Sequence, residues 1–197
     1  MKAVHKLSYG LFLLTAASDE KDNGCIINTA MQMTSNPLQV SVCVNKENLT
    51  HDMIKATGEF NVSILSEQTP FSVFQNFGMQ TGKEIDKFAD FSKVARSENG
   101  LYYLTDYANA FISVKVNKMV DVGTHTEFIG DVTEDKVLSD IPSATYQYYF
   151  DNIKPKPEKK KRGFVCRICG YVYEGDELPS DFICPICKHG ADAFDPL

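Results

Sequence analysis

The sequence predicts a mainly β protein, in which a large β-barrel domain with a few helices precedes a small domain built around a metal ion. Three observations predict this architecture. Short apolar segments recur from residue 7 to residue 133. Turn signals separate them, and helical patterns are few. A Pro- and Lys-rich stretch at residues 154–162 then interrupts the pattern. After it, two C-x-x-C pairs contain four of the six cysteines.

Length and charge divide the chain in the same way. The 197 residues are enough for one full domain and one small domain. Residues 154–162 hold six basic residues and one acidic residue, a net charge of +5, whereas residues 163–197 hold two basic and six acidic residues, a net charge of −4. We therefore expect a domain at 1–153, a basic linker at 154–162 and a second domain at 163–197. The overall net charge of −6 gives no general reason to expect nucleic-acid binding.

The N-terminus resembles a signal peptide, because a basic start precedes an apolar run at residues 7–17. Four residues interrupt that run: Ser8, Tyr9, Gly10 and Thr15. A four-cysteine metal site also fits a reducing compartment better than an oxidising one. We therefore interpret residues 7–17 as a first β-strand and expect a cytoplasmic protein. No other apolar run approaches transmembrane length, so no membrane association is expected.

Turn signals place the next strands. Residues 18–24 form a polar segment that ends in Asn-Gly, a strong hairpin signal. The return strand is expected over residues 25–33, and Ser-Asn-Pro at 35–37 breaks it. A third strand is expected over residues 38–44, where valines alternate with other residues.

Helical patterns are few. The first predicted helix covers residues 48–57, with Asn48 or Thr50 as its cap and Gly58 as its stop. The second covers residues 70–77, where a proline stands at a plausible first helical position. Three phenylalanines at helical spacing in that segment are expected to belong to the core.

The remaining segments strengthen the β assignment. A strand is expected over residues 60–65, followed by a polar loop or short helix over residues 78–90. The longest strand is expected over residues 110–122, where apolar and polar residues alternate. A turn at Gly123 leads into its partner at residues 124–133. Many strands, few helices and close hairpins favour a β-barrel over a doubly wound sheet.

The two C-x-x-C pairs can enclose one metal ion in a tetrahedral cage of thiolates. The expected ligands are Cys166, Cys169, Cys184 and Cys187. Gly170 follows the first pair, where a residue without a Cβ can take a positive φ and let backbone N–H groups turn toward the sulfurs. Such a cage suits zinc or iron, so the ligand geometry alone leaves the metal open.

The surroundings of these cysteines resemble the rubredoxins, over residues 164–176, 178–187 and 191–194. Two departures are visible: only fourteen residues separate the second cysteine from the third, and Phe182 stands where tryptophan is usual. The resemblance implies iron as the metal. Five aromatic side chains would form an apolar core around it: Phe164, Tyr171, Tyr173, Phe182 and Phe194.

A one-electron iron centre needs a group that feeds it, and a protein-bound flavin would serve. Neither a G-x-G-x-x-G fingerprint nor a Walker sequence is present. Residues 23–46, 50–51, 82–88 and 125–132 resemble the flavin reductase-like FMN-binding domains, the flavoredoxin group. This resemblance extends over nearly all of residues 1–153. It implies a split β-barrel that forms a homodimer with FMN near the interface.

The same resemblance implies the FMN contacts, although each residue alone fits an ordinary strand, cap or solvated surface. The polar edge of the isoalloxazine ring would lie beside Asn28, Thr29, Ala30, Met31, Gln32 and Thr34. Where a strand meets a helix, Asn45, Lys46, Thr50 and His51 would hold the phosphate. Lys87 would pair with flavin oxygens or with the phosphate. Phe150 would pack on the flavin or close the barrel.

His125 matches a family histidine near the flavin and the incoming nicotinamide, and it is the expected catalytic residue. The order of the two domains resembles the high-molecular-weight rubredoxins of anaerobic bacteria. That resemblance implies an NAD(P)H-dependent oxidoreductase, in which FMN passes single electrons to an Fe(Cys)4 centre. The centre would pass them to an acceptor protein, by family analogy a flavodiiron protein that reduces oxygen or nitric oxide.

An alternative remains at this stage. The chain could be an FMN-binding protein whose tail is a structural zinc ribbon, acting as a partner- or nucleic-acid-binding module. The acidic charge of both domains counts against nucleic acid.

Overall fold

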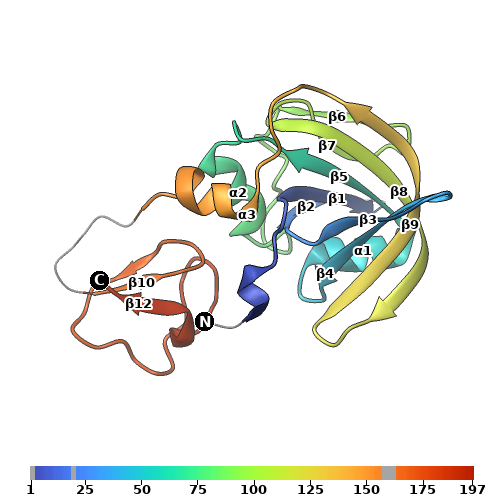
Figure 1. Ribbon diagram of the computed structural model, residues 1–197. Helices are drawn as coiled ribbons and strands as arrows, with labels where there is room; N and C mark the ends of the chain where they lie inside the picture. The colour runs from blue at the N-terminus through green and yellow to red at the C-terminus, as the bar shows by residue number, and fades with distance from the viewer. Residues whose placement is uncertain (1–2, 19–20, 157–162) are drawn as a thin grey trace.

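The structure is a computed structural model that describes residues 3–18, 21–156 and 163–197. Its larger part is a seven-stranded antiparallel sheet that curls into a barrel, in the order β2-β1-β5-β8-β9-β4-β3 (Figure 1). The strands of this sheet are β1 (Phe12–Ser18), β2 (Lys21–Ile27), β3 (Ala30–Ser35), β4 (Leu38–Asn45), β5 (Glu59–Leu65), β8 (Ala108–Asp121) and β9 (His125–Val137). A separate ribbon consists of β6 (Val94–Arg96) and β7 (Tyr102–Leu104). The expected mainly β class is confirmed.

The barrel interior is filled by the apolar faces of the strands and by helix α1 (Leu49–Thr57). Met53 and Ile54 of α1 are buried against this core. The helix ends at Gly58, whose φ of 73° lies in the left-handed region that glycine adopts without a Cβ penalty. The predicted helix and its stop are therefore confirmed, although Asn48 makes no side-chain capping hydrogen bond.

A second core lies between the sheet and helix α2 (Phe71–Gly78). Phe74 and Phe77 are buried there, as their spacing predicted. The chain reaches the same core again through α3 (Tyr146–Tyr148) and a π-helical segment, η2 (Tyr149–Ile153). In Figure 1, α2 and α3 lie on the side of the barrel that faces the small domain.

The first hairpin differs from the prediction. Ser18 pairs with Lys21, so Asn23 and Gly24 lie inside β2 and do not form the turn. The Asn23 side chain is buried and donates a hydrogen bond from Nδ2 to Thr50 Oγ1 at 2.9 Å. A tertiary hydrogen bond thus gives Asn23 a role that the local turn preference does not reveal.

The first two predicted strands also differ from the observed ones in extent. A 3₁₀ turn, η1 (Ala3–Lys6), occupies the start of the chain, and β1 begins at Phe12, later than expected. The expected return strand over residues 25–33 is two strands. β2 pairs with β1 whereas β3 pairs with β4, so the chain changes partners between them.

The small domain carries a three-stranded sheet in the order β11-β10-β12. Its strands are β10 (Phe164–Cys166), β11 (Val172–Tyr173) and β12 (Phe194–Pro196), and a 3₁₀ turn, η3 (Ala191–Ala193), precedes the last. Most of the expected linker, residues 157–162, lies outside the described residues. Within the described ranges, the chain contains no helix that is long and apolar enough to cross a membrane.

Candidate functional site

The four cysteines of the small domain come together in one cluster. The sulfur atoms of Cys166, Cys169, Cys184 and Cys187 all lie within 4.8 Å of one another. Two of the Sγ–Sγ distances, Cys166 to Cys187 and Cys169 to Cys184, are 3.5 Å. A tetrahedral ion with metal–sulfur bonds of about 2.3 Å would place its sulfurs about 3.8 Å apart. The donor set therefore fits a single tetrahedral metal ion with little adjustment.

The two halves of the cluster are built alike. In the first, the N–H of Gly170 donates to the carbonyl of Cys166 at 2.9 Å, and in the second the N–H of Lys188 donates to the carbonyl of Cys184 at 3.0 Å. Gly170 and Lys188 both have positive φ, 80° and 61° respectively. The left-handed residue after the first pair was expected. Its counterpart Lys188 was not, because lysine rarely adopts that region.

Burial and backbone hydrogen bonds set the protonation of these thiols. Burial raises the pKa of the Cys169 thiol to about 11. Burial also acts to raise the pKa of Cys184, but hydrogen bonds from the backbone N–H groups of Cys187 and Ile186 and with the thiols of Cys169 and Cys187 together outweigh it, and the pKa is lowered. A metal ion entering the cluster must displace the protons that remain, so its binding depends on pH.

An aromatic shell surrounds the cluster. The rings of Tyr173 and Phe194 approach the ring of Phe182 edge-on, with centroids 4.7 Å and 5.4 Å away. Tyr171 stacks against Phe182 at 6.4 Å, and Phe164 packs against the same group. The expected apolar core around the cysteines is confirmed. Such a shell limits the access of water to a metal ion.

Two neighbouring cavities lie where the small domain meets the barrel. Their volumes are about 250 and 450 Å³, and both are lined by Gly78, Met79 and Cys187. Together they make a cleft of the size that holds a cofactor. A cysteine of the cluster therefore lies at the wall of the cleft, beside α2 of the barrel.

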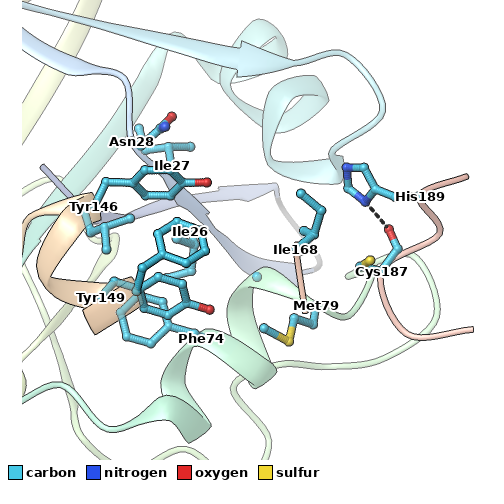
Figure 2. Close-up of a pocket in the computed structure, with 13 residues that line it drawn as sticks. Ile26, Ile27, Asn28, Phe74, Met79, Tyr146, Tyr149, Ile168, Cys187 and His189 are labelled. Carbon is cyan, nitrogen blue, oxygen red and sulfur yellow. Dashed lines mark hydrogen bonds between the residues drawn. The ribbon is translucent and has the colours of Figure 1, made fainter. Parts of the chain in front are cut away.

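The smaller cavity is mainly aromatic and apolar. Figure 2 shows Phe74, Tyr146 and Tyr149 gathered on its barrel side. Ile168 and His189 face them from the small domain (Figure 2). The His189 Nδ1 atom lies 3.0 Å from the carbonyl oxygen of Cys187. This cavity suits a flat ring system.

The larger cavity, called the polar cavity below, has more polar groups in its wall than the smaller one, and one of them is a cation. Lys87 is buried and donates from Nζ to the carbonyls of Gly24 at 2.9 Å and Phe77 at 3.0 Å. Burial lowers the pKa of this ammonium group to about 8. Asn48, Leu49 and Thr50, at the N-terminal end of α1, line the same cavity. A cation and a helix N-terminus together suit a phosphate group.

The cavity also contains an unsatisfied acceptor. Among the described residues, Asn23 Oδ1 is buried without a hydrogen-bond partner. The Asn23 side chain lines the cavity, and its Nδ2 is already engaged by Thr50. A hydroxyl group of a bound ligand could donate to this oxygen. These features fit a flavin nucleotide, whose phosphate and ribityl hydroxyls need such partners. Asn23 was missed in the sequence because its Asn-Gly pair is typical of a turn.

Four of the expected flavin residues line the cleft. Thr50 and Lys87 line the polar cavity, whereas Asn28 and Phe150 line the aromatic one. Residues of β3 lie elsewhere. Met31 is 61% exposed on this edge strand, together with Gln32 and Thr34, and Ala30 is half-buried. The Thr29 hydroxyl donates to the carbonyl of Cys43.

The other expected residues form a second group at one end of β4 and β9, and they line neither of the two cavities. Asn45 pairs with His125 in the sheet. Lys46 forms an ion pair with Asp121 at 2.8 Å. His51 is buried, and its Nε2 atom lies 2.9 Å from Thr126 Oγ1. This group is next to the lining of the larger cavity, because the carbonyl of Asn45 accepts from the backbone N–H of Asn48 at 3.1 Å.

Comparisons with known proteins agree with this architecture. The model of the flavin reductase like domain family matches residues 4–156, and that of the rubrerythrin, rubredoxin-like domain matches residues 164–195. The high molecular weight rubredoxin of Moorella thermoacetica is 39% identical, with 100% of this chain and 99% of that protein covered. The ferric-chelate reductase (NAD(P)H) of Archaeoglobus fulgidus is 41% identical over 76% of this chain and 88% of its own.

Solved structures share the barrel. Flavin reductase PheA2 superposes with a TM-score of 0.62 at 27% identity, over 73% of this chain and 88% of its own. The NADH:FAD oxidoreductase SgcE6 of Streptomyces globisporus has a TM-score of 0.65 at 20% identity, over 71% of this chain and 81% of its own, which shows the fold. Barrel and cysteine cluster together define an electron-transfer oxidoreductase that uses a flavin and iron. The chain belongs to the flavin reductase-like family and, within it, to the high molecular weight rubredoxins.

We expect the replacement Cys184→Ser to remove the metal and leave the barrel folded. The metal content should fall from one ion per chain to near zero, because a serine hydroxyl is a poor substitute for a thiolate as a ligand of a thiophilic metal ion. Elemental analysis and far-UV circular dichroism measure the two properties. Cys43→Ser, which changes a half-buried cysteine of β4, is the matched control and should keep one ion. Full metal content in Cys184→Ser would show that the cluster is not the site.

Proposed function

We propose that this chain takes electrons from NAD(P)H through FMN bound in the cleft, and delivers them singly to iron in the cysteine cluster. The iron would pass them to an acceptor protein, by family analogy a flavodiiron protein that reduces oxygen or nitric oxide. The observation that carries the proposal is the position of Cys187, a cluster cysteine that lines both cavities of the cleft. NAD(P)H is named in the similar ferric-chelate reductase, which supports it as the donor.

When bound, FMN supplies the change from two-electron to one-electron chemistry, because it accepts a hydride and releases single electrons. The chain's own residues bind and orient it. Lys87 and the N-terminal end of α1 would hold the phosphate, and Asn23 Oδ1 would accept a hydroxyl proton. Tyr146, Tyr149 and Phe150 would exclude water from the ring. We propose residues 1–153 as the flavin domain, 154–162 as the linker and 163–197 as the iron domain.

The contacts between the domains favour transfer within one chain. Residues 185–188 of the small domain line the polar cavity together with α1. Ile168, from the first half of the cluster, lines the aromatic cavity. Both halves of the cluster thus lie against the proposed flavin site of their own barrel. Docked in this way, the iron domain would need no second subunit to receive an electron.

A homodimer is also part of the proposal. Apolar side chains are exposed on the edge strand β3 and its neighbour β4: Met31, Met33 and Leu38. Such a patch is typical of an interaction surface. A partner subunit placed there would give the group around Asn45 and His125 a role at a shared site. His125 stays our candidate for the residue that meets the nicotinamide, and cytoplasmic location stays an expectation.

The replacement Thr50→Val tests the flavin site. We expect the affinity for FMN to fall about tenfold, since losing one buried hydrogen-bonding partner costs roughly 1.4 kcal/mol. Quenching of flavin fluorescence on titration measures the dissociation constant. Thr57→Val removes a hydroxyl from the same helix, where it donates to the carbonyl of Met53, and is the control. Equal affinities in the two variants would place FMN elsewhere.

The rate of iron reduction tests transfer within the chain. We expect the first-order rate constant, with excess NAD(P)H under anaerobic conditions, to be the same at 1 and 50 μM protein, because the tether supplies an effective concentration of order millimolar. Stopped-flow absorbance of the ferric thiolate band gives this constant. An observed rate constant that rises in proportion to protein concentration would mean that electrons pass between separate molecules.

A further inference from the structure

Lys154 connects the two domains at their joint. It follows directly on η2, and its backbone N–H donates to the carbonyl of Tyr149 at 2.7 Å, so its main chain belongs to the barrel. Its side chain reaches the other domain, where Nζ donates to the carbonyl of Arg167. The same ammonium lies 4.9 Å from the centre of the Phe150 ring, a cation–π arrangement.

The place that Lys154 reaches is the first half of the cysteine cluster. Arg167 stands between the ligands Cys166 and Cys169 in the sequence. A Cβ atom built on Gly170 would lie 3.9 Å from Lys154 Cε and 3.8 Å from the Pro155 carbonyl. Any side chain at position 170 would therefore contact residues 154–155, which lie close over the turn that carries two thiolates.

Lys154 interacts electrostatically with the cysteines of the cluster. Burial lowers the pKa of the half-buried ammonium, and the negative charge of Cys166, Cys169 and Cys187 acts in the opposite direction. The guanidinium of Arg167 is occupied elsewhere, near Asp195 at 3.7 Å and by the carbonyl of Asp192. The barrel side thus places the amino group of Lys154 against the turn between Cys166 and Cys169, where the field of its ammonium form acts on the cluster.

We propose that Lys154 is a positioning residue that couples docking of the iron domain to the oxidation state of its iron. The coupling rests on the proposed function, because it needs iron in the cluster. With four thiolates the centre carries a charge of −1 as Fe(III) and −2 as Fe(II). One electron from the reduced flavin makes the difference, with no bond or proton exchanged.

The direction of the coupling follows from these charges. A nearby cation stabilises the −2 state more than the −1 state, so Lys154 raises the midpoint potential of the docked domain. By thermodynamic reciprocity, reduction strengthens the docking by the same factor. The iron domain would therefore be held most firmly after it has received its electron, and released more readily once an acceptor has oxidised it.

The test compares the midpoint potentials of the full-length iron- and flavin-loaded protein and its variants, by spectroelectrochemical titration of the ferric thiolate band. In Lys154→Gln we expect the equilibrium constant for reduction of the iron to fall three- to tenfold. A tenfold fall lowers the midpoint potential by about 59 mV for one electron. Lys154→Arg keeps the charge and should restore most of the potential. Lys136→Gln removes an exposed charge from β9 of the barrel, which solvent screens, and should leave the potential nearly unchanged.

A second readout detects docking itself. Small-angle scattering of the reduced protein should give a larger radius of gyration for Lys154→Gln than for Lys136→Gln. Equal potentials in Lys154→Gln and the parent protein, or equal shifts in the two glutamine variants, would contradict the coupling while leaving the electron route intact. Protein that holds zinc and lacks the ferric band under iron-replete conditions would contradict the proposed function, and with it the coupling.

Discussion

The crowding of four cysteine sulfurs around one small space is the constraint on which the rest of this structure depends. Thiolates at 3.5 Å repel one another, and burial makes their ionisation harder still. A cation must neutralise them, and backbone N–H groups in two similar turns share the remaining charge. Apart from cysteines, the buried apolar side chains of the domain of residues 163–197 are Ala193 and Phe194, so we expect its folding to depend on the metal. The same cluster places Cys187 at the wall of the cleft.

Residues of both domains line the cleft. The barrel supplies a polar end, where Lys87 and α1 meet, and an aromatic end built by α2 and the segment around Tyr149. The iron domain closes both ends with the residues that flank its cysteines. A flavin held there would lie against the iron centre without a separate protein between them, which explains why one chain carries both domains.

Much of this could be predicted from the sequence, because the signals concerned are local. Alternation along residues 110–122 predicted β8, Gly58 marked the end of α1, and the spacing of the cysteines indicated their cluster. The helical segment over residues 146–153 was not predicted, since its aromatic rings pack on residues far away in the chain. Asn23 was misread as a turn for the same reason. The docking of the domains, and the fact that Lys87 lines the cleft whereas His125 does not, depend on long-range packing, which no local pattern reports.

The most direct test of this account is whether NAD(P)H reduces the iron only when flavin is present. Iron-loaded protein stripped of flavin would be mixed anaerobically with NADH or NADPH, before and after reconstitution with FMN, and the ferric thiolate absorbance recorded. The account predicts no bleaching without flavin, and bleaching of one iron per chain after FMN is added. Bleaching at the same rate in the flavin-free protein would contradict the electron route through the cleft.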